Sequence, residues 1–529
     1  MSWKAWRRTG VLMSALGMAV CAAAPSAVAK AAELDWRACA GAPQLECATV
    51  RVPLDYDRPK GEKITLALSR IKATDSAARK GSLVVNRGGP GYSTVEYLQG
   101  IVAGTLPSPV DAEVRKAYDI VGVDTRGSGR STPAVRCFET PAEAAAFAKD
   151  VPDAPVTAAD RQRRAKADAD FARLCRERSG GLLDHISSVS MARDLDAVRA
   201  AMGEKRLNYL GQSYGTYLGM VYANLFGDKT GKFVFDSVID PGKRDSGHPL
   251  STASSRNRTD ISTKRTLAEF FRLCEEAGDR CSFGNGDPAA AFDDILTALR
   301  KGSIQLTNPA GKKVALTYSY VVSWTGSWLY QPMFWNQLGG APFLKAVGAA
   351  IKDPAGSEAT ALAQEIELLQ QQGIGVAGYG SPIEAAFHAV TCPETDNPAN
   401  ARALAKVAAE RDKVAAPFGS LRAYETSACS FWQSKSDERH RGPWTAKTNE
   451  PVLILNSRHD PATPVWSAER VQRLLPGSRL LVNEGWGHVT TQQSTCAIKA
   501  ISAYLLEDKL PERGAECRPD TVPFAASSG

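Results

Sequence analysis

The sequence predicts an α/β fold with a mostly parallel sheet and a large, mainly helical cap inserted before the last strands. Short apolar runs that are too brief for helices, and are mostly followed by glycine-rich turns, are typical of buried parallel strands. Such runs occupy residues 82–86, 118–124, 207–210, 233–239, 452–456 and 480–483. Between two of them, apolar residues recur at helical spacing, which indicates a helix that starts after Ser190. These residues are Met191, Leu195, Val198 and Met202.

Two β-rich runs, at residues 46–56 and 64–74, precede the first parallel strand. The sequence between them at residues 58–61 contains proline and glycine, and it predicts a hairpin that enters the sheet. The Ala-rich, charged residues 139–172 are expected to form a mobile excursion from the sheet. Strands that alternate with helices elsewhere in this part of the chain indicate an α/β sheet.

The alternation stops near residues 240–242 and resumes at Pro451, so about 200 residues are inserted between two strands of the sheet. We therefore expect core segments at residues 33–240 and 451–529, with a cap at residues 241–450. Residues 262–277, 288–300, 359–372 and 400–415 are rich in helix-forming residues. A group of aromatic residues either forms the core of the cap or lines a substrate cleft. This group is Trp324, Trp328, Tyr330 and Trp335.

Composition limits the class of protein. The chain has 529 residues, of which 43% are hydrophobic and 23% charged, so it can bury a sizeable core and is neither a disulfide-dense miniprotein nor a disordered chain. The formal charge of +7 includes three basic residues near the start. Without them about +4 remains over the chain, which does not suggest a nucleic-acid partner.

Residues 1–29 are typical of a secretory signal. A basic start is followed by an apolar stretch at residues 11–24 and by the small-residue pattern Ala27-Val28-Ala29 before the expected cleavage point. A membrane anchor needs a longer apolar run, and no later segment has 18 or more consecutive apolar residues. We therefore expect a secreted, extracellular product with no integral membrane segment after signal removal.

Removal of the signal also removes Cys21 and leaves ten cysteines, an even number in a chain expected in an oxidising compartment. Sequential pairing is the simplest scheme that their spacing suggests, although spacing does not fix connectivity and a few free buried thiols are the alternative. The expected disulfides are Cys39–Cys47, Cys137–Cys175, Cys274–Cys281, Cys392–Cys429 and Cys496–Cys517.

The sequence Gly211-Gln212-Ser213-Tyr214-Gly215 follows an apolar strand and precedes a helix-compatible run, which is the setting of a nucleophile elbow. The strained turn needs small residues on both sides of the serine, and the two glycines meet that need. Ser213 is therefore the candidate nucleophile.

A serine nucleophile needs a base and an acid, which in this fold class follow the serine in the order acid, then histidine. His488 comes after the last apolar run, and Asp460 follows the preceding one. We predict that Asp460 orients His488 and that His488 activates Ser213. Neighbouring His459 is expected to be structural.

The loop Asn86-Arg87-Gly88-Gly89-Pro90-Gly91 follows a predicted strand, and its glycines leave backbone amides free to approach a reacting carbonyl. We expect the amide of Gly89, with that of Gly88 as the alternative, to act with the amide of Tyr214 as an oxyanion hole. The loop lacks the ending of a phosphate-binding loop and the spacing of a dinucleotide fingerprint. The sequence has no His-Glu-x-x-His and no Cys-x-x-Cys, so we expect neither a metal nor another cofactor.

Several of these motifs resemble one family. Residues 86–91, 124–131, 211–216 and 458–461, followed by Gly487-His488, are similar to secreted actinobacterial tripeptidyl aminopeptidases, which are α/β-hydrolases related to proline iminopeptidases. The resemblance runs from about Trp36 to Cys517. Arg87 departs from it, because the family commonly has proline at this position of the loop.

The resemblance implies release of short N-terminal peptides, mostly tripeptides, from peptides or proteins whose free α-amine is held in the cap. It also implies an acidic amine-binding residue near Cys392, for which Glu394 is the first candidate and Asp396 the second. A solvated acidic turn is the alternative for both. For the whole chain, an esterase or other small-molecule hydrolase is the first alternative function, and a non-catalytic exported binding protein is a remote one.

Overall fold

The computed structural model describes residues 34–245, 248–337, 339–371, 379, 381–436 and 438–525. Residues 1–29, which carry the expected signal sequence, lie outside the described residues. Among the described residues, no helix has both the length and the apolar character needed to cross a membrane.

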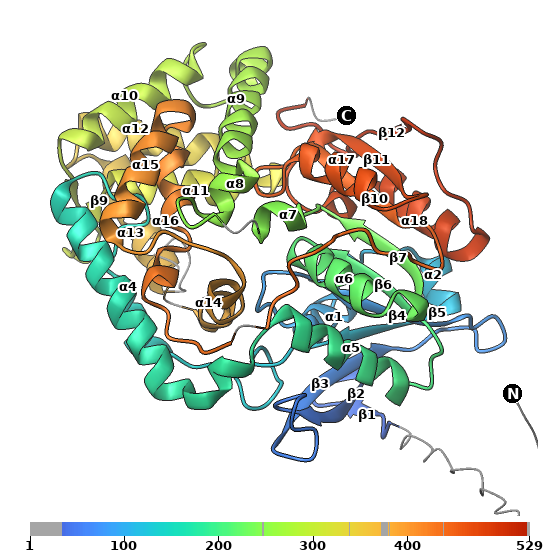
Figure 1. Ribbon diagram of the computed structural model, residues 1–529. Helices are drawn as coiled ribbons and strands as arrows, with labels where there is room; N and C mark the ends of the chain where they lie inside the picture. The colour runs from blue at the N-terminus through green and yellow to red at the C-terminus, as the bar shows by residue number, and fades with distance from the viewer. Residues whose placement is uncertain are drawn as a thin grey trace, which may run out of the picture. The chain divides into compact units, whose positions relative to one another are not determined.

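A ten-stranded sheet organises the described part of the chain (Figure 1), with the order β1-β2-β3-β5-β4-β6-β7-β10-β11-β12. The strands from β5 to β12 in this order are all parallel, whereas β1, β2 and β3 pair in antiparallel fashion at one edge. The predicted hairpin and mostly parallel sheet are therefore confirmed. The strands are β1 (Arg37–Cys39), β2 (Ala42–Pro53), β3 (Lys63–Ile71), β4 (Gly81–Asn86), β5 (Tyr118–Val123), β6 (Leu207–Gln212), β7 (Thr230–Asp236), β10 (Leu453–His459), β11 (Arg479–Trp486) and β12 (Glu516–Cys517).

Helices cover both faces of this sheet, because its central strands are apolar on both sides. Every residue of β4 is buried, and its side chains alternate between two cores. Val84 packs into the core under α5, α6 and α17, whereas Leu83 and Val85 pack into the core under α1, α2 and α18. The helices are α1 (Thr94–Val102), α2 (Ala112–Ala117), α5 (Ser188–Ala201), α6 (Tyr214–Leu225), α17 (Val465–Leu474) and α18 (Thr495–Glu507).

The start of α5 differs slightly from the prediction. The helix begins at Ser188, and the side chain of Ser187 accepts the backbone N–H of Ser190. The cap residue is thus Ser187, and Ser190 supplies the amide that is capped.

Between β7 and β10 the chain leaves the sheet and forms the inserted segment, residues 241–450, which is mostly helical. Most of its buried apolar side chains form one hydrophobic core, which includes Trp328 and Trp335 and is joined by Trp486 and Phe524 from outside the insertion. Within the described residues, all four stretches rich in helix formers are helical. The elements are α7 (Pro241–Arg244), α8 (Ala253–Asn257), α9 (Thr259–Ala277), α10 (Pro288–Lys301), β8 (Ile304–Thr307), β9 (Lys313–Leu316), α11 (Tyr318–Trp328), α12 (Ala341–Lys352), α13 (Ser357–Gln371), α14 (Pro382–Glu394), α15 (Ala401–Ala415) and α16 (Phe418–Tyr424).

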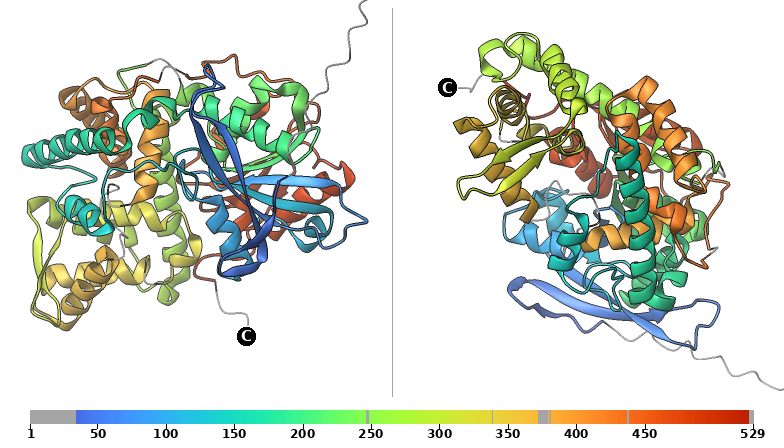
Figure 2. Two further views of the ribbon diagram at one scale, coloured as in Figure 1. Left: turned by 90° about the horizontal axis from the view of Figure 1, so that it is seen from below. Right: turned by 90° about the vertical axis from the view of Figure 1, so that its left-hand side faces the viewer.

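The stretch expected to be a mobile excursion is instead helical, as α3 (Pro141–Ala148) and α4 (Ala158–Ser179). Figures 1 and 2 show α4 alongside the inserted helices. A capping box at Thr157 starts α4, and Arg164 within it binds Asp168 and the backbone carbonyl of Tyr424. The prediction failed because the contact of Arg164 with Tyr424 joins residues that are 260 positions apart in the sequence.

Five disulfides link the ten cysteines of the described chain in the sequential pairs expected from the sequence. Cys392–Cys429 lies within the inserted segment and joins α14 to the turn at residues 427–431. The pairs are Cys39–Cys47, Cys137–Cys175, Cys274–Cys281, Cys392–Cys429 and Cys496–Cys517.

Candidate active site

Ser213 stands on a sharp turn between β6 and α6. Its backbone has φ 55° and ψ −123°, a conformation that residues other than glycine rarely adopt. A Cβ atom at Gly211 would lie 2.4 Å from the carbonyl oxygen of Gly215, and one at Gly215 would lie 2.7 Å from that of Asn86. Gly211 therefore allows β6 and α6 to approach closely, as the elbow motif requires, and Gly215 allows α6 to lie against the end of β4.

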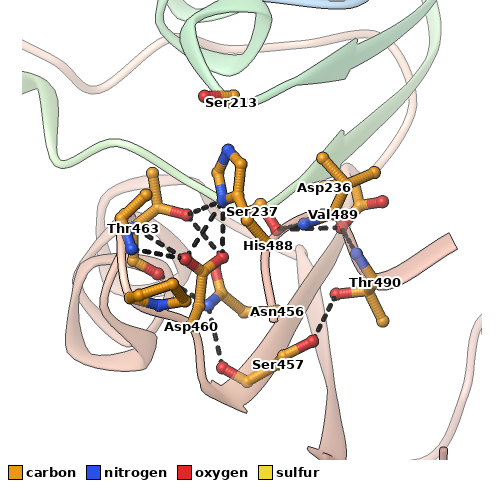
Figure 3. Close-up of polar contacts among 12 residues, drawn as sticks. Ser213, Asp236, Ser237, Asn456, Ser457, Asp460, Thr463, His488, Val489 and Thr490 are labelled. Carbon is orange, nitrogen blue, oxygen red and sulfur yellow. Dashed lines mark hydrogen bonds and ion pairs between the residues drawn. The ribbon is translucent and has the colours of Figure 1, made fainter. Parts of the chain in front are cut away.

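Asp460 and His488 meet at the same edge of the sheet, in the loops that follow β10 and β11. Nδ1 of His488 lies 2.9 Å from Oδ2 and 3.0 Å from Oδ1 of Asp460 (Figure 3). The Asp460 carboxylate is fully buried and also accepts the N–H of Ala462 and both the N–H and the hydroxyl of Thr463. These donors fix the carboxylate, which in turn fixes the imidazole ring.

Ser213 lies on the opposite side of the imidazole from Asp460, as Figure 3 shows. Both Ser213 and His488 line one cavity of about 570 Å³, which we call the main cavity. His459 does not line it, because its ring stacks on Trp486, with ring centroids 6.4 Å apart. The structure thus brings together the three residues expected to act on a substrate.

The glycine loop after β4 lies against the elbow. A Cβ atom at Gly88 would lie 2.4 Å from the carbonyl oxygen of Gln212 and 3.1 Å from the amide nitrogen of Tyr214. The amide of Gly88 already donates to Oδ1 of Asn86 at 2.9 Å, whereas Gly89 lines the main cavity. Tyr214 is the first residue of α6, where an amide has no acceptor within the helix. Gly89 is therefore better placed than Gly88 to donate to a substrate.

The wall of the main cavity away from the sheet is rich in charge. Two of the three arginines in its lining are paired with carboxylates, because Arg164 binds Asp168 at 2.9 Å and Arg422 binds Glu425 at 3.0 Å. Arg87 instead packs over the ring of Tyr92. The charged lining residues are Arg87, Asp153, Arg164, Glu384, Arg422 and Glu425.

Glu384, on α14, is the carboxylate with the least compensation. Within the described chain, its one ion-pair neighbour is Nδ1 of His388, at 3.7 Å. Burial lowers the pKa of His388 to about 4, so its ring is neutral at physiological pH. Burial, together with the charges of Glu425 and Asp153, raises the pKa of Glu384 to about 8. A cation bound beside this carboxyl group would stabilise its ionised form.

Glu394 and Asp396, expected to bind an amine, do not line the main cavity. Glu394 is 1% exposed, and its carboxylate accepts hydrogen bonds from the backbone and the hydroxyl of Ser188 at the start of α5. Asp396 accepts a hydrogen bond from Arg439 at 3.0 Å. The main cavity does not support the expectation for this pair, because neither carboxylate lines it; Glu394 is held by Ser188, and one oxygen of Asp396 is held by Arg439. Glu384 stands in the first turn of α14, which begins at Pro382, and no local sequence pattern distinguished it from the other acidic residues of the inserted segment.

A second cavity, the side chamber, adjoins Ser213 and Gly89 and has a volume of about 120 Å³. It lies between the loop after β7, which contributes Ile239, and the inserted segment, which contributes Ala253 and Asn257. Among the described residues, His488 lines the main cavity but not the side chamber.

Together, the sheet, the elbow and the Asp460–His488 pair define an α/β-hydrolase of the serine hydrolase class. Two family models match the chain: the alpha/beta hydrolase fold over residues 81–271 and the TAP-like protein over residues 413–517. The chain is 32% identical over 515 residues to the tripeptidyl aminopeptidase of Streptomyces lividans, which covers 95% of this chain and 90% of that protein. The protein therefore belongs to the tripeptidyl aminopeptidase family.

Two other relatives extend the comparison. Serine protease Hip1 of Mycobacterium tuberculosis (strain H37Rv) is 29% identical over 521 residues, which cover 92% of this chain and 91% of that protein. Carboxylesterase B of the same strain is 31% identical over 479 residues, which cover 89% of this chain and 86% of that protein. Similarity of this extent thus links the chain to relatives named as peptidases and to one named as an esterase.

Proposed function

We propose that this serine hydrolase is an exported exopeptidase that removes short peptides, chiefly tripeptides, from peptides or proteins with a free α-amine. The observation that carries the proposal is a single cavity whose lining includes Ser213 and His488 as well as the carboxylates of Glu384 and Glu425. The first pair supplies the chemistry of acyl transfer, and the second pair supplies a binding place for an ammonium group. The names of the Streptomyces and Hip1 relatives agree with peptide substrates.

In the proposed reaction, the hydroxyl of Ser213 attacks the peptide carbonyl while Nε2 of His488 takes its proton. Asp460 holds the ring through Nδ1 and stabilises the imidazolium that forms. His488 then returns the proton to the leaving amine, and a water molecule hydrolyses the acyl-enzyme by the same route in reverse. The amides of Gly89 and Tyr214 donate to the carbonyl oxygen as it becomes negative.

The inserted segment is proposed to recognise the substrate's ammonium group through Glu384 and Glu425. Glu425 already binds Arg422 and the hydroxyl of Ser254, so Glu384 is the carboxylate that an incoming cation would neutralise. The side chain of Glu384 is 31% exposed although it lies deep in the protein, because it faces the main cavity. An uncharged or blocked N-terminus would leave this carboxylate without a partner.

The two cavities suggest where the substrate lies. An extended chain advances about 3.3 Å per residue, so a bound tripeptide requires about 10 Å between the serine and the amine site. The leaving part of the substrate must pass beside His488, which lines the main cavity. The side chamber adjoins Ser213 but not His488, and it is therefore proposed to hold the side chain of the residue at the cleavage point. A cavity of about 570 Å³ is in the usual range for a ligand of this size.

Export is part of the proposal. It rests on the signal-like residues 1–29 and on five disulfides, which persist in oxidising compartments. The number of subunits is left open.

An esterase is the second candidate, because one relative is named Carboxylesterase B and the same three residues would cleave an ester. The two functions differ in their need for a free amine. The remote alternative, a binding protein without catalysis, is disfavoured by the presence of the serine, the acid and the histidine in one site.

The test is a set of fluorogenic amides of di-, tri- and tetrapeptides, each with a free and an N-acetylated amine, with products identified by mass spectrometry. We expect kcat/KM to fall by about 10- to 100-fold on acetylation, because a hydrogen-bonded charge contributes about 1.5 to 3 kcal/mol. Equal cleavage of acetylated peptides, or cleavage of small esters alone, would favour the esterase.

A further inference from the structure

Asp236, the last residue of β7, is fully buried and has no role in the reaction proposed above. Its Oδ1 accepts the N–H of Thr490 at 2.9 Å, and its Oδ2 accepts the N–H of Thr491 at 3.0 Å and the Thr491 hydroxyl at 2.9 Å. No basic side chain of the described chain forms an ion pair with it. Burial raises the pKa of the Asp236 carboxyl, and the hydrogen bonds from Thr490 and Thr491 oppose that rise.

The next residue, Ser237, continues this set of contacts. Its hydroxyl oxygen accepts the N–H of Val489 at 2.9 Å (Figure 3). The three residues that follow His488 therefore each donate their backbone N–H to the side chain of Asp236 or Ser237.

The turn held in this way is strained. Val489 is β-branched and has φ 73°, in the left-handed region that such residues avoid. A conformation of this kind persists only where the surroundings impose it. Because the strained residue directly follows His488, the contacts that impose its conformation also set where the imidazole stands.

The backbone of Asp236 reaches the other half of the site. Its carbonyl oxygen accepts the N–H of Ser213 at 2.9 Å, and Ser213 is also in the left-handed region. The side-chain amide of Gln212, the residue before the serine, donates a hydrogen bond to the Thr491 hydroxyl at 3.0 Å. One residue thus touches the elbow through its main chain and the histidine loop through its side chain.

We propose that Asp236 is a positioning residue that sets the placement of His488 relative to Ser213, with Ser237 as its assistant. The proposal rests on the serine chemistry proposed above. Asp460 orients the ring of His488 through Nδ1, whereas Asp236 fixes the backbone that carries the ring. The three donors of Thr490 and Thr491 require both oxygens of a carboxylate. An asparagine at this position has one acceptor oxygen, and its NH₂ group would face a backbone N–H.

The first test compares Asp236→Asn with Asp119→Asn. Asp119, on β5, is also buried and binds Arg79 at 3.0 Å, but it makes no contact with either loop of the site. We expect Asp236→Asn to lower kcat by about 10- to 100-fold, as small displacements of reacting groups do, with KM within about 3-fold of the wild type. Asp119→Asn should lower the melting temperature and leave kcat unchanged.

Fluorophosphonate labelling separates this inference from the proposed function, because it needs an activated serine but no peptide. The labelling rate of Asp236→Asn should fall with its kcat, and the low-field proton resonance between His488 and Asp460 should shift. If the wild type is not labelled, the serine chemistry fails. If the wild type and a folded Asp236→Asn are labelled equally fast, only the role of Asp236 fails.

Two milder variants cover the case in which Asp236→Asn does not fold. Ser237→Ala removes the acceptor for Val489. Thr491→Val keeps the side-chain shape but removes the hydroxyl that donates to Asp236 and accepts from Gln212. Each should lower kcat and the labelling rate by at least about 3-fold, the effect of one hydrogen bond. Wild-type rates in both variants would overturn the proposal.

Discussion

The backbone carbonyl of Tyr330 accepts a hydrogen bond of 2.9 Å from the N–H of His488, and the two rings pack edge to face with centroids 5.2 Å apart. Tyr330 belongs to the inserted segment, so this segment holds the loop of the proposed base as well as covering the cavity. Gly487 makes the approach feasible: a Cβ atom there would lie 2.5 Å from Pro332 and 2.8 Å from the Tyr330 oxygen. We infer that the insertion and the histidine loop are mechanically coupled.

Substitution of Gly487 should therefore separate the histidine loop from the inserted segment. Gly487→Ala is expected to lower kcat by at least about 10-fold, because a methyl group would push the histidine loop away from Tyr330. Gly514→Ala is the matched control, since Gly514 also has positive φ but has open space around its would-be Cβ atom. Both variants should lose some stability in thermal melts. Equal activity in the two would contradict the coupling.

Ser213→Ala tests the assignment of the nucleophile. Turnover of a free-amine tripeptide amide should fall by about 10⁴- to 10⁶-fold, because the covalent route is lost. The melting temperature should stay close to that of the wild type, since Ser213 contributes no side-chain hydrogen bond that caps α6. A loss of only a few fold, or continued labelling by a fluorophosphonate, would mean that another residue attacks.

The sequence was sufficient to place Ser213, Asp460 and His488 because each follows an apolar strand, and parallel strands end at the same edge of a sheet. No such rule places residues of the inserted segment. A local pattern near Cys392 predicts Glu394 as the amine-binding residue, yet its hydrogen-bond partner Ser188 is 206 residues away. The role proposed for Glu384 depends on the position of α14 at the main cavity, which helix-forming composition does not reveal.

Glu384→Gln should reveal the amine site. The substitution keeps the shape and removes the charge, so KM for free-amine peptides is expected to rise by about 10- to 100-fold with little change for a small neutral ester. Glu394→Gln is the comparison, because its carboxylate is buried against Ser188 and Arg244 and should affect the melting temperature more than KM. The opposite pattern would return the amine-binding role to Glu394.

The pH dependence should carry the signature of Glu384. An ammonium group binds the ionised carboxylate, and the pKa of about 8 leaves the empty site largely protonated at pH 6 to 7. For free-amine peptides, kcat/KM should rise up to about pH 8 and then fall as the peptide amine, with a pKa of about 7.7 to 8.0, loses its proton. Measured profiles for Glu384→Gln, and for an ester without an amine, should lack the rise between pH 7 and 8. Identical profiles for all three would argue against an ionisable group at this place.

The disulfide Cys392–Cys429 should affect substrate binding as well as stability. Cys392 lies on α14, which carries Glu384, and Cys429 lies four residues after Glu425, so the bond joins the two halves of the proposed amine site. Replacement of both cysteines by serine should cost about 2 to 4 kcal/mol in the free energy of unfolding. It should also raise KM for free-amine peptides, because the two carboxylates are no longer held in register, while turnover of a neutral ester changes little. The matched control is the double replacement of Cys39 and Cys47, which link β1 to β2 and make no contact with the cavity. Denaturant titration and peptide kinetics on both variants test this prediction. If KM rises in the control alone, or in neither variant, the Cys392–Cys429 disulfide has a purely stabilising role.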